Sequence, residues 1–296
     1  MLYSVRHILE MIRFSHTLFA LPFALLSAAL AWHRKQAFSW LELAGIGLCM
    51  VFARSAAMAF NRLVDRRLDA VNPRTAIRHL PSGKLKVAVV WMFTLACGAA
   101  FVASTVLFLF ATPANPWPIY LSAPVLLFIC IYSYTKRFTM LAHFWLGASL
   151  LLAPLAAWIA ILGIGDLLTP AILGLAVLFW VAGFDIIYAC QDAEYDRRAR
   201  LYSMPARLGV ALALRVALVS HLVMVGLLVA LFFVARPPLG PIYLGAVAAV
   251  FLLLAYEHFL VSPGDLTRVN QAFFQVNAVI SVGLLVVVLL EIVLAP

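Results

Sequence analysis

Residues 167–196 read LLTPAILGLAVLFWVAGFDIIYACQDAEYD. From Leu167 to Phe184 there is no charged residue, whereas the following stretch holds Asp185, Asp192 and Asp196. An apolar run of about 20 residues is long enough to cross the hydrocarbon core of a bilayer as one α-helix. The stretch therefore predicts a membrane-spanning helix with a group of carboxylates at one end.

The rest of the chain has the same apolar character. Of its 296 residues, 66% are hydrophobic and 11% are charged, whereas an ordinary soluble domain carries about 25% charged residues. Lipid-facing surfaces need no polar coat, so this composition predicts an all-α, polytopic protein of the lipid bilayer. We expect residues 1–296 to form a single transmembrane domain. Nine spans are predicted, at residues 14–32, 40–61, 87–111, 117–133, 141–163, 167–188, 210–234, 241–261 and 269–294.

The net charge of +9 is unevenly distributed over these spans. If the loops alternate between the two sides, seventeen of the 21 Lys and Arg residues lie on the side of the N-terminus and three on the other. The positive-inside rule then places the N-terminus in the cytoplasm, with the protein in a bacterial-type inner or plasma membrane. The positive charge is explained by topology and by anionic lipids or substrates, so nucleic acid is not an expected partner.

Two predicted cytoplasmic segments, residues 61–86 and 185–209, hold half of the twelve acidic residues. The first contains Asp65 and Asp69, and their counterparts Asp192 and Asp196 follow 127 residues later. Residues four apart share one face of a helix, so the two carboxylates of each pair are expected to point the same way. Because each pair follows an apolar span, the repeat predicts a pseudo-two-fold bundle whose acidic clusters face each other across one cavity.

Both clusters offer oxygen ligands alone. Asn61 precedes Asp65 by four residues, and Asp185 precedes Asp192 by seven, without His or Cys at ligand spacing. Mg²⁺ is typically bound by one or two carboxylates while a substrate phosphate supplies other oxygens. The clusters therefore predict a diphosphate bound through Mg²⁺, although acids beside arginines also occur as surface ion pairs. Cations near the clusters are Arg66, Arg67, Lys136, Arg137, Arg197 and Arg198.

Arg54 lies within the second span, seven residues before Asn61. A cation inside a membrane span is costly and by default marks a functional site, although an arginine can also extend its side chain to the interface. We expect Arg54 to bind an anion, either the diphosphate or an acceptor carboxylate. Aromatic residues near the second cluster, Tyr188 among them, are candidates to stabilise an allylic cation or to pack at the membrane interface.

Several separated motifs together resemble the UbiA-type family of intramembrane prenyltransferases. They are Arg54-Ser-Ala, residues 61–69 (NRLVDRRLD), 74–83 (RTAIRHLPSG), 132–139 (YSYTKRFT), 185–196 (DIIYACQDAEYD), Ser203 and 207–209 (RLG). The resemblance covers nearly the whole chain. It implies nine helices in an isoprenoid-synthase-like bundle and transfer of a polyprenyl group from polyprenyl diphosphate to an aromatic acid of the 4-hydroxybenzoate type, in quinone biosynthesis.

The resemblance also assigns roles to individual residues. It implies Mg²⁺ at Asn61, Asp65, Asp192 and Asp196, supported by Asp69 and Asp185. Diphosphate would be bound by Arg13, Lys136 and Arg137, and the acceptor pocket would be lined by Arg54 and Tyr188. The reaction would be metal-assisted loss of diphosphate, attack of the aromatic ring on the allylic carbon, and loss of the ring proton.

Three departures from the family pattern leave the acceptor open. Asn61-Arg62 stands where the family often has Asn-Asp, Arg78-His79-Leu80 where it has Arg-Pro-Leu, and Asn72-Pro73-Arg74-Thr75 where it has Val-Lys-Arg-Thr. The NPRT and RHLPSG motifs resemble those of a family branch in which the acceptor would be 1,4-dihydroxy-6-naphthoate, for menaquinone. Branches making haem, chlorophyll or lipid ethers are a further alternative. A secondary transporter, with Arg54 and the acids as a coupling site, is the alternative outside this family.

Overall fold

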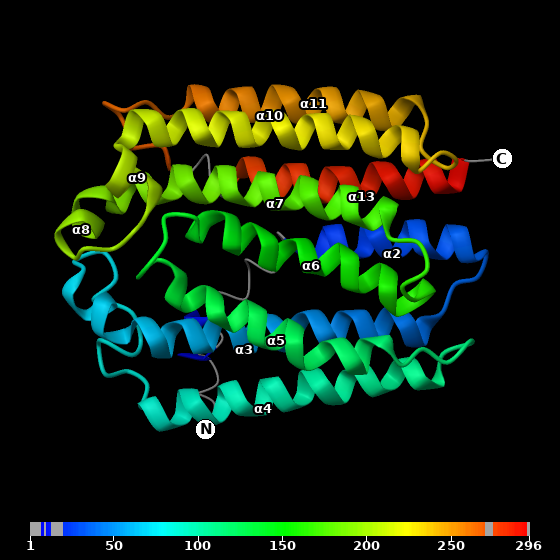
Figure 1. Cartoon of the computed structure of the whole chain (residues 1–296), viewed down its shortest axis with the longest axis horizontal. Helices are drawn as coiled ribbons and strands as arrows, with labels where there is room; N and C mark the ends of the chain where they lie inside the picture. Colours follow the sequence, from blue (N-terminus) through cyan, green and yellow to red (C-terminus); the bar gives the residue numbers. More distant parts are fainter. Residues whose placement is uncertain (1–6, 9, 13–19, 270–274, 295–296) are drawn as a thin grey trace. The chain divides into compact units, whose positions relative to one another are not determined.

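The computed structural model describes residues 7, 8, 10–12, 20–269 and 275–294. Within these ranges the secondary structure is helical, apart from an isolated bridge between Ser262 and Asp265 (Figure 1). Eight of the described helices are long and apolar enough to cross a membrane, which confirms the all-α, multi-span prediction. The count of nine is not confirmed, because the first predicted span is described only from residue 20 onward, mostly as the 15-residue helix α2 (Leu21–Lys35).

The other long helices overlap the remaining eight predicted spans, although α3 extends to Val71 and α13 begins at Asn277. Helix boundaries coincide with residues that favour them: α11 begins at Pro241, whose fixed φ suits a first helical turn, and α6 ends before Gly163, which has a φ of 71°. The long helices are α3 (Trp40–Val71), α4 (Val87–Thr105), α5 (Trp117–Thr135), α6 (Ala142–Leu162), α7 (Leu168–Ala189), α10 (Val210–Val234), α11 (Pro241–Phe259) and α13 (Asn277–Leu294). The short ones are η2 (Val106–Phe110), η3 (Cys190–Asp192), α8 (Ala193–Arg198) and α9 (Met204–Leu208).

Contacts divide the chain into two compact units. The first comprises residues 1–17 and 40–134, and the second comprises residues 18–39 and 135–296. The cluster around Asp65 therefore belongs to the first unit, and the cluster around Asp192 belongs to the second. The single domain and the facing clusters stay predictions.

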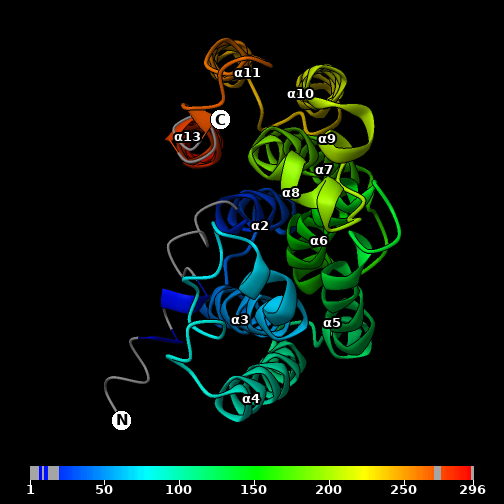
Figure 2. The same cartoon turned by 90° about the vertical axis from the view of Figure 1, so that its left-hand side faces the viewer.

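In the first unit, α3 and α4 run antiparallel and pack side by side (Figures 1 and 2). The segment at residues 10–12 packs against this pair: Met11 and Ile12, each 3% exposed, share an apolar cluster with Leu63 of α3 and Val90 of α4. Leu63 lies between Asn61 and Asp65 in the sequence. The N-terminal segment is thus fixed beside the acidic end of α3.

In the second unit, α7 packs against α2, α6 and α10. Small residues let helices approach closely: a Cβ atom on Gly147 of α6 would lie 2.3 Å from the backbone oxygen of Leu178 in α7. The rings of Phe23 in α2 and Trp180 in α7 lie 5.0 Å apart between centroids. This packing buries α7 on several sides and fixes its C-terminal end, which carries Asp185.

Large apolar side chains are exposed on both units. Phe259, Val293 and Trp40 have exposed fractions of 86%, 79% and 76%. Such surfaces are unfavourable in water and are covered by lipid tails in a bilayer. Together with the lengths of the helices, they support an integral membrane protein; the cytoplasmic location of the N-terminus stays a prediction.

Candidate active site

The first acidic cluster lies at the C-terminal end of α3. Asn61, Asp65 and Asp69 occupy successive turns of this one helix, which confirms that they share a face. The helix continues to Val71, well past the predicted end of the span at residue 61. Asp65 is 2% exposed and Asp69 is 5% exposed. Carboxylates this buried depend on the groups that contact them.

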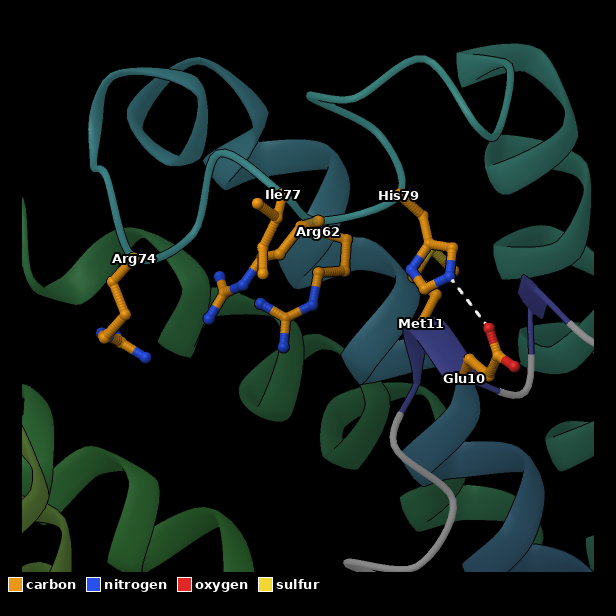
Figure 3. A pocket seen from close by; sticks show the side chains of 7 residues that line it. Glu10, Met11, Arg62, Arg74, Ile77 and His79 are labelled. Carbon is orange, nitrogen blue, oxygen red and sulfur yellow. Dashed lines mark hydrogen bonds and ion pairs between the residues drawn. The ribbon is translucent and has the colours of Figure 1, made fainter. Parts of the chain in front are cut away.

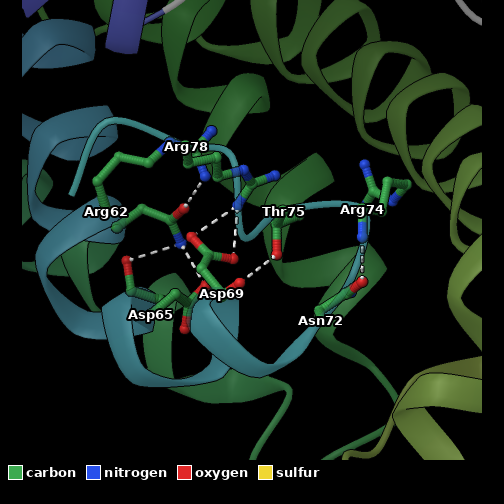
Figure 4. A network of polar contacts seen from close by, with 9 residues as sticks. Arg62, Asp65, Asp69, Asn72, Arg74, Thr75 and Arg78 are labelled. Atoms are coloured by element: carbon green, nitrogen blue, oxygen red, sulfur yellow. Dashed lines mark hydrogen bonds and ion pairs between the residues drawn. The ribbon is translucent and has the colours of Figure 1, made fainter. Parts of the chain in front are cut away.

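Asp69 is held by Arg78. Nη1 of Arg78 donates hydrogen bonds to both carboxylate oxygens, at 2.7 and 2.8 Å, and the Thr75 hydroxyl donates to the backbone oxygen of Asp69 at 3.0 Å (Figure 4). Charge-assisted hydrogen bonds of this kind are strong. Arg78 is not among the predicted site residues, although the RTAIRHLPSG segment that contains it carries part of the family resemblance.

Asn72 turns the chain so that Arg78 can reach back to Asp69. The side-chain oxygen of Asn72 accepts a hydrogen bond from the Arg74 backbone N–H at 2.9 Å. Its backbone oxygen accepts hydrogen bonds from the backbone N–H groups of Thr75 and Ala76, at 3.0 and 2.9 Å. Asn side chains favour turns because they bond to the backbone two residues on. The Asn72-Pro73-Arg74-Thr75 motif therefore follows the end of α3 and begins the loop formed by residues 72–86.

Asn61 contacts Asp65 directly. Its Nδ2 donates to Asp65 Oδ2 at 3.2 Å and to the Ser133 hydroxyl of α5 at 3.5 Å. Its oxygen accepts a hydrogen bond from Arg62 Nη1 at 3.4 Å. A metal ion shared by Asn61 and Asp65 would be bound through the amide oxygen, so the amide would have to turn over and release Arg62.

The second cluster is built differently from the first. Asp185 lies on the last turns of α7, Asp192 on the 3₁₀ turn η3, and Asp196 on α8. The expectation that Asp192 and Asp196 share a face of one helix is therefore wrong, because Asp192 has φ −100° and ψ 3° and only caps α8. The two carboxylates remain close enough to repel each other electrostatically.

His143, which is not among the predicted site residues, connects this cluster to neighbouring helices. Its Nδ1 lies 2.7 Å from Asp185 Oδ2, and its Nε2 accepts a hydrogen bond from the Met204 backbone N–H at 3.3 Å. A nitrogen that accepts is not protonated, so the ring proton is on Nδ1 and is donated to Asp185. His143 is 5% exposed and joins α6, α7 and the first residue of α9. His143 and Asp185 are 42 residues apart, so local sequence spacing does not predict this hydrogen bond.

Asp196 lies near Lys136, a cation in the connection between α5 and α6. Lys136 attracts its carboxylate, and Asp192 repels it. The backbone oxygen of Lys136 also accepts a hydrogen bond from the Tyr202 N–H at 2.7 Å, which ties this connection to the segment after α8. Within the second unit, Lys136 and Asp192 therefore lie near Asp196, and His143 links Asp185 to the start of α9. The roles of these residues in one site stay predictions.

The remaining predicted binding residues lie in varied settings. Arg54 is half-buried on α3. Nη1 of Arg66 donates to the backbone oxygen of Leu63 at 2.7 Å, so this side chain folds back on its own helix. Arg137 is exposed. Tyr188 packs against an apolar cluster that includes residues of α7, α9 and α10 and of the segment after α11. Arg13 lies outside the described residues.

The donor atoms of both clusters fit a hard divalent cation. They are carboxylate oxygens and one amide oxygen, the ligand set that Mg²⁺ prefers. Asp192 and Asp196 place two like charges close together, and a bound cation would relieve their repulsion. Asp69 fits a direct ligand less well than Asp65, because both of its oxygens contact Arg78.

Comparison with known proteins agrees with this arrangement of helices. The model of the UbiA prenyltransferase family matches residues 20–279. The chain belongs to the UbiA prenyltransferase family. It is similar to the structure titled as the apo form of a UbiA homolog from Aeropyrum pernix K1, at 30% identity and a TM-score of 0.81, over 94% of this chain and 97% of that one.

Two further similarities lie within the same family. A UbiA homolog from Archaeoglobus fulgidus, whose structure is titled as bound to GPP and Mg²⁺, has a TM-score of 0.71 at 19% identity and covers 97% of this chain and 100% of that one, which shows the fold alone. The mitochondrial 4-hydroxybenzoate polyprenyltransferase of Schizosaccharomyces pombe is 33% identical over 57% of this chain. The match spans 46% of that relative's length.

Proposed function

We propose that this protein transfers a prenyl group from a polyprenyl diphosphate to an aromatic carboxylic acid of the 4-hydroxybenzoate type. The observation that carries the proposal is the pair of oxygen-ligand clusters, Asn61 with Asp65 on α3 and Asp192 with Asp196 after α7. In a chain with twelve acidic residues, two such clusters at the ends of apolar helices need a common explanation. A metal-bound diphosphate supplies one, if the two clusters face each other as the repeat predicts.

The family relatives support the substrate classes. The S. pombe relative is named for 4-hydroxybenzoate and a polyprenyl group, and the A. fulgidus homolog is titled as bound to GPP and Mg²⁺. We propose the same classes here: Mg²⁺ as cofactor, a prenyl diphosphate as donor and an aromatic acid as acceptor. We also propose that the acidic ends of the helices face the cytoplasm, as the distribution of Lys and Arg predicts.

In this mechanism the chain holds the diphosphate and shields the reacting carbon. Asn61, Asp65, Asp192 and Asp196 would hold Mg²⁺, which supplies positive charge to stabilise the leaving diphosphate. Lys136 and Arg137 would contribute further positive charge. The allylic C–O bond breaks and diphosphate leaves with the bonding electrons. The π electrons of the acceptor ring form the new C–C bond to the allylic carbon. The ring carbon then releases its proton to water or to the departed diphosphate, which restores aromaticity. Arg54 would bind the acceptor carboxylate, and Tyr188 would face the allylic cation.

The test is an assay of the purified protein with a long prenyl diphosphate, Mg²⁺ and an aromatic acid. Asp65→Asn and Asp192→Asn should each remove most of the product, because an amide keeps the shape of a carboxylate but not its charge. The matched control is Asp166→Asn, since Asp166 is 45% exposed at the side chain and pairs with Arg34 outside both clusters. Product formation by Asp65→Asn at the wild-type rate would refute the proposal, and solute uptake lost without any change in turnover would favour a transporter.

The loop at residues 72–86 favours a second acceptor for the same chemistry. Its NPRT and RHLPSG motifs resemble those of the branch that would use 1,4-dihydroxy-6-naphthoate. Arg78 in this loop holds Asp69. Both acceptors carry a carboxylate that Arg54 could bind. Offering the two acids in parallel to the wild-type protein separates them by the mass of the product. Prenylation of neither acid would refute the proposed acceptor class.

A further inference from the structure

Three side chains with metal-binding chemistry meet in the first unit, apart from the acidic clusters. His7 and Glu10 lie on the N-terminal segment, whose described residues are 7, 8 and 10–12. His79 lies in the loop at residues 72–86. One nitrogen of each imidazole and one carboxylate oxygen of Glu10 lie within 4.8 Å of one another. Among the described residues this is the one group of three or more His, Cys, Asp or Glu side chains with that spacing.

The distances fit a tetrahedral metal site. His7 Nδ1 lies 3.3 Å from Glu10 Oε2, and His79 Nε2 lies 3.4 Å from the same oxygen. Zn²⁺ is bound at about 2.0–2.2 Å by imidazole nitrogen and carboxylate oxygen, which puts neighbouring ligand atoms about 3.4 Å apart in a tetrahedron. Two of the three spacings already have this value. The imidazole rings are tilted by 57° with centroids 5.2 Å apart, so they are not stacked.

Apolar neighbours, one buried and two partly buried, hold all three ligands in place. Met11 follows Glu10, Ile8 follows His7 and Leu80 follows His79, and all three apolar residues pack in the same cluster with Leu63 of α3. His7 and Glu10 are also three residues apart, and residues at this spacing share a face of a helical turn. The backbone that carries the ligands is therefore fixed before any ion binds, which lowers the entropic cost of binding.

We propose that His7, Glu10 and His79 bind Zn²⁺ or a similar first-row transition metal ion. Two imidazoles and one carboxylate form a ligand set for such ions, whereas the oxygen-only clusters suit Mg²⁺. The ion would join the N-terminal segment to the loop at residues 72–86, whose Arg78 holds Asp69. This proposal does not depend on the prenyl-transfer reaction.

Three protein ligands leave a fourth coordination position open. Glu10 and His79 also line a cleft with a volume of about 220 Å³. Figure 3 shows these two side chains at one end of the cleft, with Arg62 and Arg74 farther along it. An ion at this site would be reached from the cleft, and water or a small anion could complete its coordination.

The test uses Co²⁺ as a spectroscopic substitute for Zn²⁺ on the full-length protein, stripped of metals and kept in excess Mg²⁺. The excess Mg²⁺ is there to compete with Co²⁺ for the oxygen-only clusters. Tetrahedral Co²⁺ absorbs visible light far more strongly than six-coordinate Co²⁺ bound by oxygen. We expect strong visible bands in the wild type. His79→Ala and Glu10→Gln should each weaken Co²⁺ binding by about 100-fold, the upper end of the loss for removal of a group that supports a metal site.

Two variants serve as controls. His33→Ala removes a histidine at the end of α2, and Asp192→Asn changes an oxygen-only cluster; both should keep the bands. Glu10 is 43% exposed at its side chain, so Glu10→Gln tests the site with little risk to folding. The proposal is overturned if the wild type shows no strong bands, or if Glu10→Gln binds Co²⁺ as the wild type does. The visible Co²⁺ bands can be absent while prenyl transfer persists, so the metal-site proposal and the proposed function are tested separately.

Discussion

Two substitutions at His143 separate its two hydrogen bonds. The amide of Asn lies near the position of Nδ1 and that of Gln near the position of Nε2. His143→Asn therefore keeps a donor for Asp185 and removes the acceptor for the Met204 N–H, whereas His143→Gln does the opposite. Because Asp185 belongs to the proposed metal cluster, the two variants should affect different properties of the protein.

The size of the effect follows from the 2.7 Å contact between His143 Nδ1 and Asp185. A hydrogen bond to a charged group contributes about 1.5–3 kcal/mol. A loss of about 2 kcal/mol in positioning Asp185 corresponds to about 30-fold in kcat/KM. We expect His143→Gln to lose this factor in prenyl transfer and to need more Mg²⁺ for half-maximal rate. His143→Asn should keep most of the activity.

Stability should change in the opposite order. His143→Asn leaves the buried Met204 N–H without its acceptor, at a cost of about 1–3 kcal/mol, and should lower the unfolding midpoint of the purified protein. The assay is kcat/KM over a Mg²⁺ titration, combined with thermal unfolding of each variant. Equal losses of activity in both variants would show that His143 serves packing alone, and wild-type kcat/KM in His143→Gln would refute its role in positioning Asp185.

Three more predictions concern the packing and the metal. Arg78→Ala should destabilise the protein by about 3 kcal/mol, because it leaves the buried Asp69 carboxylate without the Arg78 cation. Arg198→Ala, the control at an exposed ion pair, should cost under about 0.5 kcal/mol. Equal unfolding midpoints for the two variants would contradict the stabilising role of Arg78. Gly147→Ala should cost about 1–3 kcal/mol, since its Cβ would meet the Leu178 backbone at 2.3 Å, whereas Gly165→Ala, with nothing within 4 Å, should leave the midpoint unchanged. Chelation of divalent cations should abolish prenyl transfer and added Mg²⁺ should restore it; transfer that persists in chelator would count against the metal clusters.

Some features could be read from the sequence because they depend only on neighbouring residues. Apolar runs of about 20 residues predict spans wherever they occur, since each must satisfy its own backbone as a helix. The shared face of Asp65 and Asp69 follows from the helical repeat alone, and α3 confirms it. The same rule fails at Asp192 and Asp196, because a 3₁₀ turn at Cys190–Asp192 interrupts the helix and local spacing gives no sign of it.

The partners of the acids were decided by tertiary structure. Arg78 reaches Asp69 across a turn, His143 reaches Asp185 from another helix, and His79 lies 69 residues from Glu10. A hydrogen bond or a metal site needs atoms within a few ångströms, and helix packing and loop paths determine which distant residues come that close. The sequence therefore determined that this is a helical membrane protein with carboxylate pairs on its helix ends. Only the packing of α6 against α7, and of the N-terminal segment against α3, decided which histidines and arginines those carboxylates meet.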